Sequence, residues 1–333
     1  MMDLSSLKDY LAEDWRAVQR LMTSALRCDI DILEQVNASI LSSSGKQLRP
    51  LVSLLVARMC SREGKVSEAT IRYAAASELL HNATLLHDDV ADSSDIRRGK
   101  PTVRALMGPS ASVLVGDFWL VRAIDLIRGG DGFSPMDMEA VGIFSKTLGD
   151  LAQGEMLQLQ KAQECDTTLE DYEKIIYCKT ASLFEASWHS AALSVEADKE
   201  VCRRIIDFSV NLGLAFQVRD DILDNVGDAA VGKPLGVDLL EHKMTAPLLC
   251  ALECVSAGKA EEIRRKVASL ESGNNSVKDE IMKFVAENDG VAHATRMLEK
   301  YVEKALDALD MFPESFEKQA LVQLARFTAE RNC

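Results

Sequence analysis

Apolar side chains recur at every third or fourth position through most of the chain, which is the spacing that places them on one face of an α-helix. The pattern is clear in residues 296–309, where the apolar positions are Leu298, Tyr301, Val302, Ala305 and Leu309. No run alternates between polar and apolar positions as a half-buried strand would. Residues 51–59 are strongly apolar and could be mistaken for a strand, but their neighbours are helical, so we expect a buried helix there. The pattern predicts an all-α fold.

Short stretches rich in Gly, Pro, Ser and Asn separate the predicted helices. We expect helices at residues 4–41 (two), 51–59, 66–90, 111–127, 136–162, 168–193, 199–224, 243–257 and 296–309. Residues 93–102 are expected to form a polar loop, and the Gly-rich residues 226–237 a mobile lid. No solenoid-type repeat is present, so we predict a single domain over residues 1–333, with helices around a deep central cavity. Its core would begin at about residue 30, after N-terminal helices within residues 4–41.

Charge and composition narrow the possible partners. The chain has 333 residues, 47% of them hydrophobic, and a net charge of -14, which argues against nucleic acid and anionic membranes as partners. The N-terminal segment lacks the basic region and apolar run of an export signal, and no stretch is long enough to span a bilayer. Eight cysteines are scattered without a complete zinc motif, which indicates reduced thiols in a cytoplasmic protein.

An acidic motif, Asp-Asp-x-x-Asp, occurs twice, at residues 88–92 and 220–224, each time at the end of an apolar helical pattern. Its first and last aspartates lie four residues apart and therefore share a helix face. One such cluster alone would be interpreted as a solvated acidic surface, but two copies favour a function. Carboxylates without Cys or His suit a hard cation such as magnesium, shared with substrate phosphates. The candidate ligands are Asp88, Asp89, Asp92, Asp220, Asp221 and Asp224.

Basic residues near these motifs could bind an anion. Arg97 and Arg98 follow the first motif, and phosphate binding is favoured over salt bridges to nearby aspartates. Lys46 and Arg49 follow Gly45, where an anion site and an ordinary basic turn are equally compatible with the sequence. Other candidates are individually weak because each would also fit an ordinary helix or loop. They are His81, Lys179, Thr180, Lys233 and Lys243.

The second motif has two further polar or small residues on its helix face. Gly213, Gln217, Asp220 and Asp224 are spaced by four, three and four positions. Gly213 would let a ligand approach the backbone, and Gln217 would place an amide dipole beside the metal site.

Taken together, these motifs resemble the trans-prenyltransferases, the polyprenyl diphosphate synthase family. The resemblance rests on LLHDDVAD, RRGKPT, GDFWL, LAQGEMLQL, KTASLFEAS, FQVRDDILD and GVDLLEHK, which cover most of the chain in the expected order. It implies an isoprenoid synthase helical bundle, usually a homodimer, which condenses an allylic diphosphate with isopentenyl diphosphate. Roughly two or three magnesium ions per active site would assist.

The resemblance also implies a role for each candidate residue. Asp88, Asp92 and Asp220 would be the main magnesium ligands, and Asp89, Asp221 and Asp224 would act directly or through water. The allylic diphosphate would be held by Arg97, Lys179, Lys233 and Lys243, and isopentenyl diphosphate by Lys46, Arg49, His81 and Arg98. Thr180 and Gln217 would face the carbocation. The chain departs from many members at Gln153, where they have Glu, and at His242, where they have Gly.

Product length depends on the floor of the pocket. Ala83 and Thr84 precede the first motif where short-chain members often carry aromatic residues, so we predict a long product of roughly C35 to C45 for a quinone side chain. A short-chain synthase, making farnesyl or geranylgeranyl diphosphate, is the main alternative. A non-catalytic regulatory subunit fits less well, because both acidic motifs are intact. A terpene cyclase fits less well, because its second metal motif normally mixes Asn, Ser or Thr with Glu, and because this chain has an additional isopentenyl site.

Overall fold

The computed structural model describes residues 4–43, 45–129, 134–226, 236–271 and 275–331. Its first half contains α1 (Leu4–Tyr10), α2 (Ala12–Ala25), α3 (Asp31–Ser42), α4 (Leu48–Cys60), α5 (Glu68–Ala91), α6 (Val103–Met107), α7 (Pro109–Arg128) and α8 (Pro135–Glu164). Then follow α9 (Leu169–Ile176), the π-helix η1 (Tyr177–Ala181), α10 (Ser182–Leu193), α11 (Lys199–Val226), α12 (Val237–Leu240), α13 (Ala246–Glu253), α14 (Ala257–Ala268), α15 (Asn275–Glu287), α16 (Gly290–Leu309) and α17 (Phe316–Glu330). The all-α prediction is confirmed.

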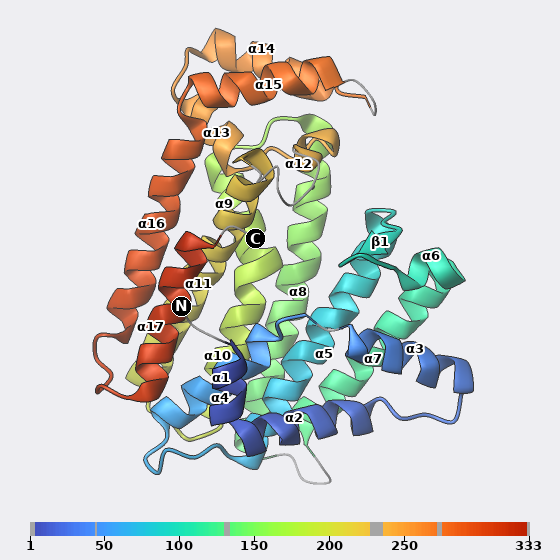
Figure 1. Ribbon diagram of the computed structural model, residues 1–333, viewed down its shortest axis with the longest axis vertical. Helices are drawn as coiled ribbons and strands as arrows, with labels where there is room; N and C mark the ends of the chain where they lie inside the picture. The colour runs from blue at the N-terminus through green and yellow to red at the C-terminus, as the bar shows by residue number, and fades with distance from the viewer. Residues whose placement is uncertain (1–3, 44, 130–133, 227–235, 272–274, 332–333) are drawn as a thin grey trace.

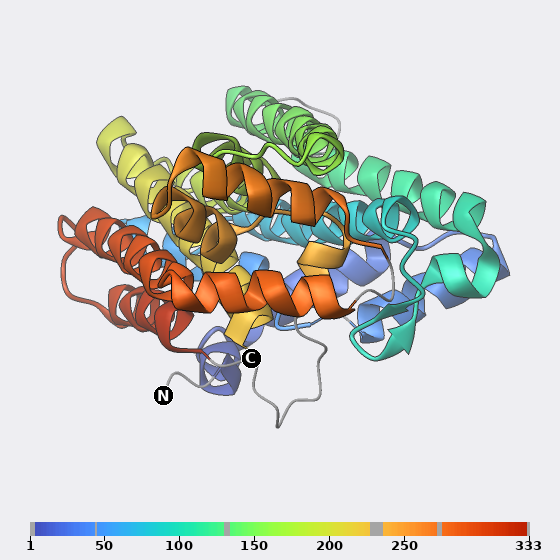
Figure 2. The same ribbon diagram turned by 90° about the horizontal axis from the view of Figure 1, so that it is seen from above.

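Long helices run side by side along the molecule, and shorter ones cross its two ends (Figure 1). α5 packs against α7, and α11 packs against α10 and α16. Large side chains such as Trp119, Trp188 and Phe208 are fully buried between these helices. Seen from above, α14 and α15 lie across one end of the bundle (Figure 2). Burial of these apolar faces provides the main stabilisation of the bundle.

The N-terminal region forms three helices, where the sequence pattern predicted two. Only Leu11 separates α1 from α2, and α3 begins after a turn at residues 26–30. The Asn37 amide donates a 2.9 Å hydrogen bond to the carbonyl of Leu26, which fixes that turn. The first helix also contacts the last, since the Tyr10 hydroxyl lies 2.5 Å from Oε1 of Glu317.

The expectation of no strand was wrong at residues 96–101. There β1 (Ile96–Arg97) and β2 (Lys100–Pro101) pair antiparallel, in the loop that follows the first acidic motif. Both central residues of the turn, Arg98 and Gly99, have positive φ, of 51° and 74°. Two-residue hairpins favour this geometry because it matches the twist of the strands. Two-residue strands are too short to show alternation in the sequence.

The predicted helix over residues 168–193 is present but contains a π-helical segment, η1, between α9 and α10. The helix expected at 243–257 instead begins at Ala246, after the short helix α12, which the pattern did not predict. Most of the predicted lid, including Lys233, lies outside the described residues. Within the described ranges, no helix combines the length and apolar character needed to cross a membrane.

Candidate active site

The first acidic motif occupies the C-terminal end of α5, as expected, and Asp92 is the helix C-cap. Burial, followed by the nearby charge of Glu155, raises the pKa of Asp88 to about 6. Asp89 is turned away from Asp88 and lies within the protein, where its Oδ1 is 2.7 Å from Nε of Arg97. Arg97 therefore forms the salt bridge to a nearby aspartate that the sequence analysis placed second to phosphate binding.

The second motif lies near the C-terminal end of α11, and its three aspartates have different surroundings. Asp220 is 2.7 Å from the guanidinium of Arg331. Tyr172 and Gln217 donate hydrogen bonds of 2.5 and 2.9 Å to Asp221. Burial raises the pKa of Asp221 to about 6 in spite of these bonds.

 Asp221 is 3% exposed and is the buried aspartate of this motif, since Asp220 and Asp224 are partly exposed.

Asp224 joins this motif to α12. Its Oδ1 accepts a 3.2 Å hydrogen bond from the amide of Val237, and its carbonyl accepts one of 3.0 Å from Gly236. Among the described residues, its Oδ2 is buried and has no hydrogen-bond partner. A buried carboxylate oxygen without a donor is unfavourable unless a cation binds there, so this atom fits a metal site.

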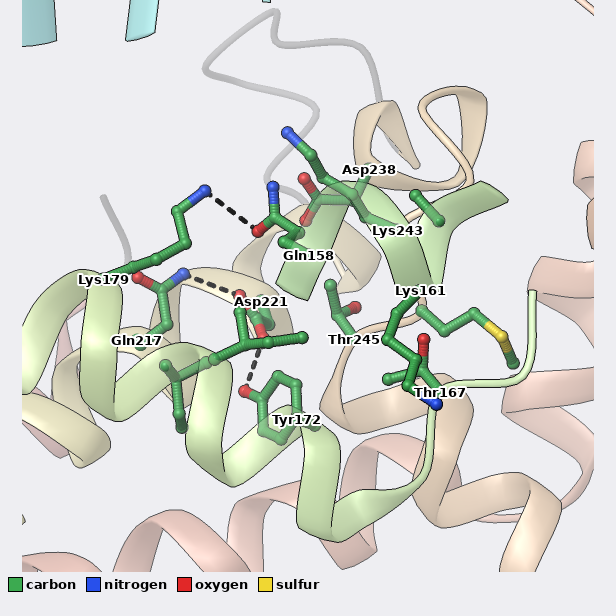
Figure 3. Close-up of a pocket in the computed structure, with 14 residues that line it drawn as sticks. Gln158, Lys161, Thr167, Tyr172, Lys179, Gln217, Asp221, Asp238, Lys243 and Thr245 are labelled. Carbon is green, nitrogen blue, oxygen red and sulfur yellow. Dashed lines mark hydrogen bonds between the residues drawn. The ribbon is translucent and has the colours of Figure 1, made fainter. Parts of the chain in front are cut away.

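The π-helix η1 presents Lys179 and Thr180 between the two motifs. Nζ of Lys179 lies 2.5 Å from Glu155 and 3.0 Å from Oε1 of Gln158, both on α8. The Thr180 hydroxyl donates a 2.8 Å hydrogen bond to Oε1 of Gln217 on α11. Since Gln217 also contacts Asp221, a continuous series of polar contacts runs from α8 through η1 to the second motif. Figure 3 shows Lys179, Gln217 and Asp221 within one pocket.

Two glycines permit this close arrangement. A Cβ on Gly154 would lie 2.5 Å from Cβ of Cys178, and one on Gly213 would lie 2.6 Å from Cα of Ala181. Both distances are shorter than real contacts, so α8 and α11 can approach η1 only where they carry glycine. The prediction that Gly213 admits a ligand was wrong, because the backbone of η1 fills the space beside it.

The turn after α12 brings Lys243 to the first motif. Nζ of Lys243 lies 3.6 Å from Asp92 and 2.5 Å from Glu241. Burial, and then the charges of Asp221 and Asp224, raise the pKa of Asp238 to about 7. Lys243 thus lies between the two motifs. Together with Lys179 and Asp238 it lines a cavity of about 210 Å³ (Figure 3).

A second group of basic residues surrounds the N-terminal end of α4. The Arg98 guanidinium packs on Gly45, where a Cβ would lie 2.9 Å from its Cζ, and donates a 3.3 Å hydrogen bond to the carbonyl of Ser43. Arg49 lies over the ring of Phe184, and burial lowers its pKa to about 10. Burial, together with the charges of Arg49 and Arg98, lowers the pKa of His81 well below its usual value.

These basic residues converge as the sequence predicted for an anion site. Within the described residues, the Nε of Arg49 is buried without a hydrogen-bond partner, so it could donate to a bound anion. Lys46 lies at the exposed edge of the same turn. By contrast, Ala83 is fully buried, Thr84 is half-buried, and neither lines the 210 Å³ cavity.

Several residues of the site were not predicted, because their sequence context is ordinary. They are Glu155, Gln158, Tyr172, Asp238, Glu241 and Arg331. Glu155 and Gln158 lie three positions apart on α8 and therefore share one face of the helix. This spacing is the feature of the sequence that could have indicated a polar face directed at the site. No three His, Cys, Asp or Glu side chains in the described ranges converge closely enough to hold a metal alone.

Comparison with known proteins identifies the family. The family model for polyprenyl synthetase matches residues 30–285 of the chain. The chain belongs to the polyprenyl synthetase family. It is 34% identical to the octaprenyl diphosphate synthase of Haemophilus influenzae over 333 residues, which cover 100% of this chain and 98% of the relative.

Solved structures of polyprenyl synthetases have the same fold. The decaprenyl diphosphate synthase of Rhodobacter capsulatus superposes with a TM-score of 0.89 at 30% identity, covering 99% of this chain and 100% of that one. A polyprenyl synthase of Caulobacter crescentus, complexed with calcium and isoprenyl diphosphate, gives a TM-score of 0.87 at 32% identity, covering 99% and 98%. The isoprenoid synthase bundle implied by the sequence is therefore confirmed.

Proposed function

We propose that this protein is an all-trans polyprenyl diphosphate synthase that elongates an allylic diphosphate with successive isopentenyl diphosphates to a long-chain product. One observation carries the proposal: Lys179 and Lys243 lie between the two acidic motifs, beside a polar cavity. Two carboxylate groups with intervening lysines suit a diphosphate that is shared with cations. The full-length similarity to long-chain synthases supports the same reaction, with a quinone side chain as the destination.

The acidic motifs would hold magnesium, in roughly two or three ions. Asp88, Asp92 and Asp220 are the proposed ligands, and the unpartnered oxygen of Asp224 supports a further contact. Asp89 and Asp221 are engaged by Arg97 and Tyr172, which supports an indirect role for both. The bound metal would neutralise the negative charge that develops on the diphosphate as its carbon–oxygen bond breaks.

The two lysines would hold the allylic diphosphate itself. Lys179 and Lys243 would donate from opposite sides of the cavity, exchanging their present contacts with Glu155 and Glu241 for phosphate oxygens. Arg97 would join them by leaving Asp89, and Lys233 is proposed from the family motif alone. The lysine charges oppose the charge that grows on the leaving group, which lowers the barrier to ionisation.

Thr180 and Gln217 would stabilise the allylic cation. The Thr180 hydroxyl donates to Oε1 of Gln217, and the Gln217 amide donates to Asp221, so the side-chain oxygen of each residue has a fixed direction. Oxygen dipoles beside the cation stabilise it without acting as nucleophiles. The double bond of isopentenyl diphosphate then forms the new carbon–carbon bond. Loss of one proton, which the released diphosphate can accept, completes the condensation.

Isopentenyl diphosphate would bind at the second basic group. Lys46, Arg49, His81 and Arg98 are the proposed contacts. The buried, unpartnered Nε of Arg49 supports this assignment, because an anion would supply the missing acceptor.

A homodimer is the proposed assembly. Large apolar side chains are exposed on three consecutive helices: Leu106 (69%) on α6, Leu114 (67%) and Val121 (56%) on α7, and Met156 (66%) on α8. Exposed apolar residues on helices that pack against one another favour a protein interface. Light scattering during gel filtration tests this, with Leu114→Arg expected to yield monomer. The cytoplasmic location inferred from the sequence stays a prediction.

A product assay tests the proposed function. The protein, with magnesium and labelled isopentenyl diphosphate, is incubated with geranyl, farnesyl or geranylgeranyl diphosphate, and the dephosphorylated products are separated by length. We expect a ladder that ends at one long chain. A ladder ending at C15 or C20 would favour the short-chain alternative. No incorporation with any primer by folded protein would favour the regulatory-subunit alternative.

A further inference from the structure

The short helix α12 ends in a Schellman motif. The amide of Lys243 donates a 2.9 Å hydrogen bond to the carbonyl of Asp238, and the amide of His242 donates one of 3.0 Å to Leu239. His242 is the left-handed residue of this motif, with φ of 58°. Glycine is the usual residue at such a position, because a side chain is strained there. A histidine at this position therefore calls for a reason in its side-chain contacts.

The His242 side chain connects the turn to two other elements. Its Nε2 lies 2.9 Å from the carbonyl oxygen of Leu270, just after α14, and its Nδ1 lies 3.8 Å from Sγ of Cys165, just after α8. A carbonyl oxygen can only accept, so Nε2 carries the hydrogen, and in the neutral ring Nδ1 is left to accept from the thiol. The thiol has a single hydrogen, and the carbonyl of Ala162, 3.2 Å away, is the other acceptor available to it. The imidazole thus bridges α8 and α14.

The residue after His242 is the lysine that reaches the first acidic motif. Nζ of Lys243 is 3.6 Å from Asp92, although Asp92 and Lys243 belong to distant parts of the chain. The stem of Lys243 starts from the turn that the imidazole attaches to α8 and α14. We propose that His242 is a positioning residue, which fixes the 241–243 turn so that Lys243 points into the cavity toward the allylic diphosphate. The inference rests on the proposed function of Lys243.

The backbone turn and the side-chain attachment can be separated experimentally. In His242→Gly the left-handed turn is retained, because glycine accepts positive φ without strain, while both side-chain contacts are lost. Glu196 offers a matched control, since it is exposed and has φ of 57° far from the site, after α10. Glu196→Gly therefore makes the same backbone change without touching Lys243.

The experiment combines steady-state kinetics with hydrogen exchange. For His242→Gly we expect KM for the allylic primer to rise about threefold to tenfold, with KM for isopentenyl diphosphate unchanged. The amide of Lys243, bonded to Asp238, should exchange faster without any substrate or metal. His242→Gln, whose Nε2 can reach Leu270, should recover part of both effects. Glu196→Gly should change neither.

A double-mutant cycle with Lys243→Met decides whether the effect passes through the lysine. Calorimetry measures the binding of a non-hydrolysable allylic thiolodiphosphate. His242→Gly should weaken this binding when Lys243 is present. In a protein that already carries Lys243→Met, His242→Gly should cause no further loss of affinity. An equal loss in both backgrounds, or unchanged KM and exchange in His242→Gly, would overturn the proposal. If the natural protein makes no product with any primer, it is the proposed function that is wrong. The hydrogen-exchange result would then still show whether His242 stabilises the 241–243 turn.

Discussion

The hydroxyl of Tyr172 lies 2.5 Å from Oδ2 of Asp221, in the interior beside the second acidic motif. Asp221 is buried, and its other oxygen accepts from the Gln217 amide. The phenol therefore supplies a second side-chain donor to this buried carboxylate, and the carboxylate in turn orients the Gln217 amide. We infer that Tyr172 on α9 acts as a positioning residue for Gln217 through this carboxylate.

Tyr172→Phe removes only this hydroxyl. We expect a loss of about 1–3 kcal/mol in the free energy of unfolding, because the buried carboxylate loses a donor, and a fall in kcat because the Gln217 amide is less well oriented. Tyr301→Phe is the matched control: its hydroxyl donates a 2.7 Å bond to Glu173, outside the site. Denaturant unfolding and kcat measure the two effects. Equal loss of kcat in both variants would contradict the assigned role.

Raised carboxyl pKa values predict an unusual pH dependence without metal. Burial is the largest cause of the raised pKa of Asp88 and Asp221, both about 6, and of Asp238, about 7. A carboxyl whose pKa is raised on folding contributes stability below its unfolded pKa, near 4, and loses it as the pH rises through the folded pKa. The metal-free protein should therefore unfold at a lower temperature at pH 8 than at pH 5.

Magnesium with pyrophosphate should reverse this difference, because bound cations favour the ionised carboxylates. Thermal unfolding in a chelator, and then with magnesium and pyrophosphate, measures both states. Asp88→Asn provides the internal check, since it should stabilise the metal-free protein at pH 8 and gain less from the metal. A metal-free protein that becomes steadily more stable between pH 5 and pH 8 would contradict the prediction.

The glycines that face η1 should tolerate no methyl group. Gly213→Ala places Cβ against the backbone of Ala181, and Gly154→Ala places it against Cys178, so each should destabilise the protein by about 1–3 kcal/mol and lower activity. Gly142→Ala in α8 has nothing within 4 Å of the new Cβ and should stabilise by about 0.5–1 kcal/mol. Chemical denaturation of the three variants tests the contrast. Similar changes in the free energy of unfolding for all three variants would show that intrinsic helix propensity, and not contact with η1, determines the effect.

Arg331 should compete with magnesium for Asp220. Its guanidinium lies 2.7 Å from the carboxylate and also donates to the carbonyl of Phe216. Arg331→Gln should lower the magnesium concentration needed for half-maximal pyrophosphate binding, while costing about 1–3 kcal/mol of stability through lost buried contacts. Arg326 is an exposed residue of α17, so Arg326→Gln changes the net charge equally. It should change neither the magnesium midpoint nor the free energy of unfolding. Calorimetric magnesium titration distinguishes them, and an unchanged midpoint would exclude competition.

A larger side chain ahead of Asp88 should shorten the product. Thr84 lies one turn before Asp88 on the same face of α5 and is half-buried, so Thr84→Phe should block the growing chain with little loss of stability. Ala83→Tyr should also shorten it, but Ala83 is fully buried and overpacking would cost about 1–3 kcal/mol. Product lengths from the labelled assay give the answer. Unchanged product lengths in both folded variants would show that residues other than Ala83 and Thr84 form the floor of the product pocket.

The features that could be predicted from the sequence are those determined by hydrophobic periodicity and by the spacing of charged residues. Most long helices of the bundle follow from apolar spacing, although α14, α15 and α17 were not predicted. The acidic motifs follow from two identical patterns at helix ends. The basic cluster of Arg49, His81 and Arg98 was predicted from the family motifs and does converge in space. Roles that depend on a distant neighbour were not predictable. Gly213 is compatible with a ligand or with another helix, and only the position of Ala181 decides between them.

Short or irregular elements were missed for a different reason. α12 has four residues, which is too few to show a period, and η1 differs from an α-helix by its hydrogen bonds rather than by its composition. Asp238 and Tyr172 lie in unremarkable surroundings in the sequence. Both acquire their importance from tertiary contacts with the second motif.

The π-helical segment gives this active site a simple evolutionary signature. A π-turn holds one residue more than the α-turn it replaces, so the segment 177–181 corresponds to a single-residue insertion in what would otherwise be a continuous helix from α9 to α10. Deleting one residue there would restore regular helix geometry but rotate Lys179 and Thr180 away from α8 and α11. Natural variation should therefore conserve chain length at this segment more strictly than residue identity.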